Sequence, residues 1–141
     1  MRLKNRIAIV TGAARGIGLA IAERFIAEGA TVVISDVTDA EGEAAAKKIG
    51  ASYIHCDVAK SADVNALVSA VTARHGAIDI LVNNAGIAIV RGVDDLTEAD
   101  FDQTMLVNLK SADRNIFTLR ARLLWLVELK ENVPPPCGPL M

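Results

Sequence analysis

The sequence predicts an α/β domain built around a doubly wound parallel sheet. Short apolar runs alternate along the chain with longer segments whose apolar residues recur at helical spacing. A strand that is joined to the next strand through a helix requires a parallel crossover, so this alternation favours a parallel sheet covered by helices. The length of 141 residues corresponds to one domain.

The predicted elements alternate through residue 82. Apolar and β-branched runs indicate strands at residues 7–10, 31–35, 52–56 and 78–82. Helical spacing or an alanine-rich composition indicates helices at residues 17–28, 40–49 and 61–75. Ser61 is predicted to be the N-cap of the third helix, because a serine hydroxyl is suited to accept a hydrogen bond from a first-turn amide.

The alternation stops after residue 92. Thr97-Glu98-Ala99-Asp100 is a capping-type helix start, and the helical signal then continues through Asn108 to about residue 131. Prolines at 134–136 end it, because proline lacks the N–H that a helix requires. No fifth strand is predicted, so the sheet is expected to be truncated after about four strands, with a long helix at its end.

The composition excludes several classes of function. A net charge of −2 and an aromatic content of 4% provide neither a basic field nor stacking platforms, so nucleic acid is not expected as a partner. No apolar run approaches the length of a membrane span, and the first residues lack the apolar core of a signal peptide. Cys56 and Cys137 lie far apart and fit neither a disulfide framework nor a zinc site, so a cytoplasmic protein without a metal is expected.

The main chemical motif is the segment Thr11-Gly12-Ala13-Ala14-Arg15-Gly16-Ile17-Gly18, which follows the first predicted strand and opens the first helix. Glycines in this context allow a tight turn, close approach of the backbone to a pyrophosphate, and tight packing of helix on strand. The helix N-terminus also presents free N–H groups to phosphates. The motif therefore indicates a dinucleotide site. The alternative is that the glycines only make a tight connection.

An acidic residue follows the second predicted strand, as a dinucleotide site requires. Asp36 lies 18 residues after Gly18, at the end of that strand. Its carboxylate would accept hydrogen bonds from both hydroxyls of the adenosine ribose and would repel a 2′-phosphate, which favours NAD over NADP. Arg15 argues weakly for NADP, because an arginine in the turn would attract that phosphate. The alternative for Asp36 is that it begins a solvated loop.

Four sequence blocks together resemble the short-chain dehydrogenase/reductase family. They are the Thr-Gly-x-x-x-Gly-x-Gly turn, Cys56-Asp57-Val58 after the third strand, Asn83-Asn84-Ala85-Gly86 after the fourth, and the Val-Asn-Leu stretch around Asn108. The blocks occur in the family's order at the ends of the predicted elements, and the likeness covers about residues 3–111. The resemblance implies a Rossmann-like fold with a dinucleotide as ligand.

The resemblance assigns a role to each matching position. Asp57 would accept a hydrogen bond from the adenine amino group, the Val58 backbone would hold the ring, and residues 84–86 would form a floor beside the adenosine ribose. Asn108 would bend its helix and hold a water of a proton relay, which makes it the one residue assigned to catalysis. The implied cofactor-binding residues are Gly12, Arg15, Gly16, Ile17, Gly18, Asp36, Asp57, Val58, Asn84, Ala85 and Gly86.

Several of these positions also have a purely structural interpretation. Asp57 is suited to cap the third helix, because aspartate is a favoured N-cap residue. Asn83 and Asn84 are typical turn residues, since asparagine tolerates unusual backbone angles. An asparagine within a helix, such as Asn108, is often simply solvated.

The family's catalytic groups have no counterpart in this sequence. Enzymes of the family that it resembles use a tyrosine as general acid and base, a lysine four residues later and an upstream serine. The single tyrosine, Tyr53, lies in a predicted strand, and the residue four positions later is Asp57. The chain is therefore interpreted as roughly the N-terminal half of such an enzyme, with no catalysis expected from this half alone.

The likeness ends near Ser111, which divides the chain into an NAD-binding unit at 1–111 and an atypical helical tail with a proline-rich end at 112–141. One hypothesis for the tail is a frameshift in the gene. The other is a short form of the protein in which Leu119, Leu123 and Leu126 line one helical stripe. That stripe would pack on the domain's own sheet or form the interface of a homo-oligomer.

Three functions follow from these observations. The first is an NAD-linked oxidoreductase that transfers hydride to or from a small alcohol or ketone, as the resemblance implies. The second is a dinucleotide-binding fragment without catalysis, and the third is an assembly module. The sequence favours binding of the dinucleotide as the capacity that this chain retains.

Overall fold

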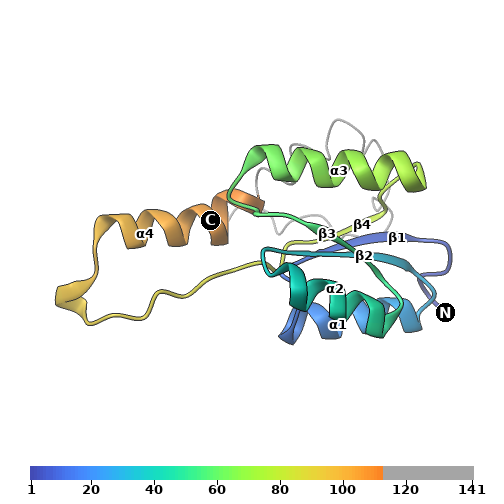
Figure 1. Ribbon diagram of the computed structural model, residues 1–141, viewed down its shortest axis with the longest axis horizontal. Helices are drawn as coiled ribbons and strands as arrows, with labels where there is room; N and C mark the ends of the chain where they lie inside the picture. The colour runs from blue at the N-terminus through green and yellow to red at the C-terminus, as the bar shows by residue number, and fades with distance from the viewer. Residues whose placement is uncertain (113–141) are drawn as a thin grey trace, which may run out of the picture.

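A parallel sheet of four strands, in the order β3-β2-β1-β4, is the centre of the computed structural model, which describes residues 1–112. Helices α1 and α2 cover one face of the sheet and α3 covers the other, while α4 projects away from it (Figure 1). The strands are β1 (Ile7–Thr11), β2 (Thr31–Asp36), β3 (Ser52–His55) and β4 (Ile80–Val82). The helical elements are α1 (Gly16–Ala27), α2 (Asp39–Ile49), α3 (Ser61–His75), η1 (Val93–Asp95), α4 (Glu98–Met105) and η2 (Leu106–Lys110).

The strand order shows that the sheet is doubly wound. The chain moves outward from β1 to β2 and β3, and then returns to place β4 on the opposite side of β1. The direction of winding therefore reverses between β1 and β4. This order confirms the predicted fold class, and it places a crevice at the carboxyl ends of the strands, where such sheets bind ligands.

Two apolar layers hold the helices on the sheet. Neighbouring strands present side chains to the same face when they are paired in register, and successive residues alternate between faces. Ile9 and its register partner Val33 belong to the cluster under α3, whereas Val10 and Ile34 belong to the cluster under α1 and α2. All four are fully buried, so the strands read as continuous apolar runs, as expected for a sheet covered on both faces.

The ends of the predicted elements before residue 82 agree with the structure within two residues. The prediction that Ser61 caps α3 is wrong. Lys60 occupies the N-cap position without a side-chain cap, and Ser61 is the first helical residue. The physical reason is the preceding turn, in which the Lys60 N–H donates to the Asp57 carbonyl and so fixes where the helix begins.

Helix α4 begins as predicted but does not continue unbroken. Thr97 and Asp100 form a reciprocal capping box at its start. The π-helical segment η2 then interrupts the regular α-helix that the sequence predicted through Asn108. The rest of the predicted long helix, its leucine stripe and its proline-rich end lie outside the described residues.

An arm formed by residues 83–105, which ends with α4, leaves the sheet after β4 (Figure 1). Val90, Val93 and Phe101 on this arm are exposed to solvent within the described part of the chain. Between residues 1 and 112, no helix combines the length and the apolar character needed to cross a membrane. The same residues contain no cluster of histidine, cysteine and carboxylate side chains arranged to hold a metal ion.

Candidate functional site

The loops that follow all four strands meet at the carboxyl edge of the sheet and enclose a pocket of about 600 Å³. This volume is within the range of small-molecule sites. The pocket brings together eight of the predicted cofactor-binding residues: Gly12, Arg15, Asp36, Asp57, Val58, Asn84, Ala85 and Gly86. Its other lining residues are Val37, Thr38, Cys56, Ile87, Gln103 and Val107, which the sequence analysis did not assign to binding. The other three predicted cofactor-binding residues, Gly16, Ile17 and Gly18, do not line the pocket but form the first turn of α1, next to Arg15.

The glycine turn packs backbone to backbone against the loop after β4. Gly12 has a φ of 63°, and a Cβ atom built on it would lie 2.6 Å from the Cα of Ala85. A Cβ on Gly18 would lie 2.5 Å from the side-chain nitrogen of Asn84. Glycine is therefore required at both positions by close approach, which explains part of the motif without reference to any ligand.

Thr11 links the ends of β1 and β4. Its buried hydroxyl donates to the Val82 carbonyl at 3.2 Å and accepts from the backbone N–H groups of Asn84 and Ala85, each at 3.1 Å. The Asn84 side-chain amide returns two hydrogen bonds, to the carbonyls of Thr11 at 3.0 Å and Gly12 at 2.9 Å. Sequence reasoning missed this role of Thr11, although a hydroxyl residue at the end of an apolar strand is the kind of signal that would indicate it.

The buried hydroxyls of Thr11 and Ser35 provide a matched pair of stability tests. Thr11→Val leaves two backbone N–H groups without their acceptor, so we expect the free energy of unfolding to fall by about 2 kcal/mol. Ser35 is also fully buried, but its hydroxyl has no hydrogen-bond partner in the described chain. Ser35→Ala should therefore change the free energy of unfolding by less than about 1 kcal/mol, or raise it. Denaturant unfolding measures both, and equal losses in the two variants would contradict this assignment.

Asp36 connects β2 to the glycine turn and does not simply begin a solvated loop. Its Oδ2 atom accepts from the Ala14 N–H at 3.1 Å. Its Oδ1 atom accepts from the N–H groups of Val37 at 2.8 Å and Thr38 at 3.3 Å, and from the Thr38 hydroxyl at 3.1 Å. These bonds hold the carboxylate at the pocket wall, with Oδ2 carrying a single partner and so retaining an acceptor site.

The N-terminus of α1 lacks the side-chain cap that α4 has. Arg15 occupies the N-cap position, where a guanidinium has no acceptor atom to offer, and no side-chain cap bond forms. The N–H groups of the next residues, Gly16, Ile17 and Gly18, are those that a helix leaves without an intrahelical partner. The positive end of the α1 dipole and these donors therefore lie next to Arg15, which lines the pocket.

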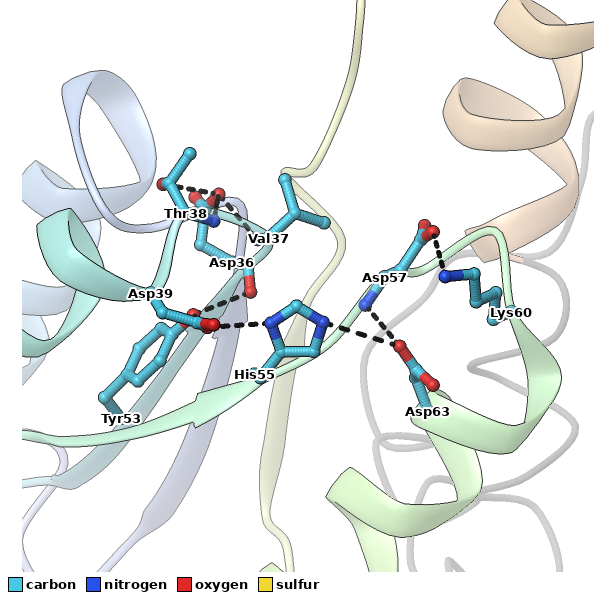
Figure 2. Close-up of polar contacts among 9 residues, drawn as sticks. All are labelled: Asp36, Val37, Thr38, Asp39, Tyr53, His55, Asp57, Lys60 and Asp63. Carbon is cyan, nitrogen blue, oxygen red and sulfur yellow. Dashed lines mark hydrogen bonds and ion pairs between the residues drawn. The ribbon is translucent and has the colours of Figure 1, made fainter.

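Asp57 follows β3 and lines the pocket, and the two residues that contact its carboxylate belong to the turn between β3 and α3. Its Oδ1 atom accepts from the Ala59 N–H at 3.0 Å, and its Oδ2 atom lies 3.4 Å from the Lys60 ammonium. Its backbone N–H donates to Asp63 on α3 at 3.0 Å (Figure 2). Lys60, not Asp57, is the N-cap of α3, so the interpretation of Asp57 as a helix cap does not hold.

A polar network joins the two walls across the end of β3. Figure 2 shows the His55 ring between Asp39 of α2 and Asp63 of α3. Its Nδ1 atom lies 2.7 Å from Asp39 Oδ1, and its Nε2 atom lies 3.8 Å from Asp63 Oδ2. The Tyr53 hydroxyl lies 2.7 Å from the same Asp39 carboxylate and 2.8 Å from the Asp36 carbonyl. The hydrogen bonds from Tyr53 and His55 lower the pKa of Asp39.

Tyr53 has a structural role in this network. Burial, followed by the neighbouring Asp39 carboxylate, raises the pKa of the Tyr53 hydroxyl well above its ordinary value. Its ring packs where a side chain on Gly42 would otherwise lie. Tyr53 is therefore a poor proton donor or acceptor near neutral pH, in agreement with its interpretation as an ordinary strand aromatic.

Cys56 forms part of the pocket floor as a neutral thiol. Burial, with smaller contributions from the Asp63 and Asp57 carboxylates, raises its pKa to about 11. Because the thiolate is the reactive species, we expect Cys56 in a Cys137→Ser variant to react with a chromogenic disulfide reagent at least about a hundredfold more slowly in the native than in the unfolded protein. Similar rates in the two states would contradict the position given to Cys56.

Asn108 lies in η2, and its side chain forms two hydrogen bonds with the main chain of the loop after β4. Its Oδ1 atom accepts from the Ile87 N–H at 2.8 Å, and its Nδ2 atom donates to the Ile87 carbonyl at 2.9 Å. The two bonds fix the main chain next to Gly86, where a Cβ would lie 3.3 Å from the Asn108 oxygen. Asn108 is therefore more than a solvated helix residue, and its helix is distorted at this point.

Comparison with known proteins gives a consistent result. The family model for short chain dehydrogenases matches residues 6–119, a segment that extends past Ser111. Galactitol 2-dehydrogenase of Agrobacterium fabrum is 42% identical over 130 residues, which cover 86% of this chain and 51% of that protein. Tropinone reductase-like 1 of Erythroxylum coca is 46% identical over 117 residues, which cover 79% of this chain and 43% of that protein.

The same likeness is found among solved structures. A short chain dehydrogenase from Mycobacterium smegmatis superimposes with a TM-score of 0.80 at 34% identity, covering 84% of this chain and 53% of that one. The chain thus spans about half the length of the relatives that it matches.

Proposed function

Since the chain belongs to the short-chain dehydrogenase family, we propose that the pocket at the carboxyl edge of its sheet binds the adenosine half of NAD. One observation carries this proposal: the glycine turn, Asp36, Asp57 and the loop 84–86 line the same pocket. These segments follow four different strands, and a doubly wound sheet is the arrangement that brings such segments together at a ligand site.

The pyrophosphate would be held at the N-terminus of α1. The uncapped N–H groups of Gly16, Ile17 and Gly18 and the helix dipole supply donors and partial positive charge for an anion. Gly12 and Gly18 place the turn against the loop after β4, which keeps side chains out of this region. The site therefore fits a phosphate-bearing ligand on its own geometry.

The adenosine would be recognised by two carboxylates. The open acceptor site of Asp36 Oδ2 suits a ribose hydroxyl, and Asp57 with the Val58 backbone suits the adenine ring edge. Asp36 would repel a 2′-phosphate at the same place, so NAD is proposed as the cofactor in preference to NADP.

The reaction proposed for the complete enzyme is hydride transfer between the cofactor and a small alcohol or ketone. When bound, NAD supplies a nicotinamide ring that accepts or donates hydride. Within this chain, Asn108 would act as a positioning residue, because its two bonds to Ile87 hold the loop that follows the proposed ribose floor. The tyrosine and lysine pair of the family is not among these 141 residues, so this chain is proposed to bind NAD without turning over substrate.

Calorimetric titration of the 141-residue chain with NAD, NADP and ADP-ribose tests the proposal. We expect NAD and ADP-ribose to bind at one site and NADP to bind at least about tenfold more weakly, because its additional phosphate meets Asp36. An assay of NAD reduction with a panel of alcohols and sugar alcohols should show no turnover. The absence of adenine nucleotide binding would contradict the proposed function, and alcohol-dependent NAD reduction would contradict its non-catalytic form.

A further inference from the structure

One cation lies directly at the wall of the proposed ribose site. Arg15 lines the pocket together with Asp36, and its neighbour Ala14 donates its N–H to the Asp36 carboxylate. An arginine at this place is suited to bind a phosphate, because its guanidinium offers several donors in a planar fork. Taken alone, Arg15 would favour a cofactor with a 2′-phosphate and would oppose the effect of Asp36.

Arg15 is engaged by an acidic residue from the next helix. Its guanidinium lies 3.2 Å from the carboxylate of Glu41, in the first turn of α2. Asp36 ends β2 and Glu41 lies in the first turn of α2, so the short β2–α2 connection keeps the two carboxylates close in sequence; Asp36 lines the pocket, whereas Glu41 reaches it through its contact with Arg15. A phosphate that approached Arg15 would compete with Glu41 for the guanidinium and would lie close to the carboxylates of Glu41 and Asp36.

We propose that Glu41 is a second determinant of cofactor choice, which acts by occupying Arg15 and so keeps the site selective for a ribose without a 2′-phosphate. This inference rests on the proposed function and concerns the same pocket. Glu41 is a positioning residue in this account, since it acts on the ligand through Arg15. The ion pair is exposed, so its contribution is expected to be a modest factor added to the larger effect of Asp36.

The test compares the affinities of the full chain for NAD and NADP, measured by calorimetry. Glu41→Gln should lower the ratio of NAD affinity to NADP affinity by about two- to fivefold, the range of an exposed ion pair. In an Arg15→Ala background the same change should leave the ratio unaltered, because the residue through which Glu41 acts is gone. Glu43→Gln removes the same charge from the same helix but does not pair with Arg15, and it should have less than half the effect of Glu41→Gln.

The outcomes separate the two proposals. Intact NAD binding with an unchanged affinity ratio in Glu41→Gln overturns the role of Glu41 and leaves the proposed function standing. An equal shift in the Arg15→Ala background, or from Glu43→Gln, also overturns it, because a general charge effect would then explain the result. If the unaltered chain binds neither NAD nor NADP, the proposed function fails, and the role of Glu41 fails with it.

Discussion

Replacing Gly12 with alanine should lower the free energy of unfolding by about 4 kcal/mol and abolish binding of NAD. Two effects add at this position. A side chain at a φ of 63° costs about 1–2 kcal/mol, and its Cβ atom would also lie 2.6 Å from the Cα of Ala85. The neighbour is backbone and cannot rotate away, so relief requires the glycine turn and the loop after β4 to separate, at a cost of about 1–3 kcal/mol.

Gly16→Ala is the matched control for this prediction. Gly16 has a similar φ of 61°, but a Cβ on it would meet no atom within 4 Å. The backbone cost remains and the overlap is absent, so the expected loss of stability is about 1 kcal/mol. Denaturant unfolding compares the two variants directly. Equal losses of stability in the two variants would contradict the prediction, because they would show that the overlap of a Cβ at position 12 with Ala85 costs nothing.

Replacing Asp36 with alanine is expected to weaken NAD binding by about a hundredfold. The change removes a charge-assisted acceptor for the ribose and also removes the hydrogen bonds that Ala14 and Thr38 donate to Asp36. Asp36→Asn retains the shape of the side chain and removes its charge, so it should also reduce the preference for NAD over NADP.

The control for the Asp36 variants is Asp94→Asn, which removes one negative charge from the exposed element η1 outside the pocket lining. It should leave both affinities within about twofold, since salt screens the effect of an exposed charge outside the site. An Asp36→Ala protein that is folded and binds NAD as tightly as the unaltered chain would place the adenosine elsewhere.

The sheet and its helices could be predicted from sequence because their signals are local. Apolar runs such as Ile7–Val10 and the glycine that follows them mark strands, turns and helix starts without knowledge of the fold. Three of the four motif blocks were assigned to one dinucleotide, and the strand order brings residues of all three to one pocket, whereas Asn108 of the fourth block does not line it. Local periodicity and parallel crossovers together determine this much.

The contacts across the site could not be predicted, because they depend on distances between loops. The position of Thr11 at the end of an apolar strand indicates a hydrogen-bonding role, but it does not identify the partners Asn84 and Ala85, which lie more than seventy positions away. The pairing of Arg15 with Glu41 depends in the same way on where α2 packs. The family resemblance implied a bend at Asn108, but helical spacing alone does not distinguish the π-helical segment η2 from a regular α-helix.

Amide chemical shifts of the isotope-labelled full chain, recorded by NMR during a titration with NAD, test the central claim most directly. The account predicts saturable shifts for Ala14 and Gly16 in the turn and for Asp57 and Val58 across the pocket, with little change along α4. Asp57 and Val58 line the pocket, and Ala14 and Gly16 are the sequence neighbours of the lining residue Arg15, so a single site must shift all four amides with one dissociation constant. Shifts confined to α4, or no shifts at millimolar NAD, would contradict the claim that this pocket binds the dinucleotide.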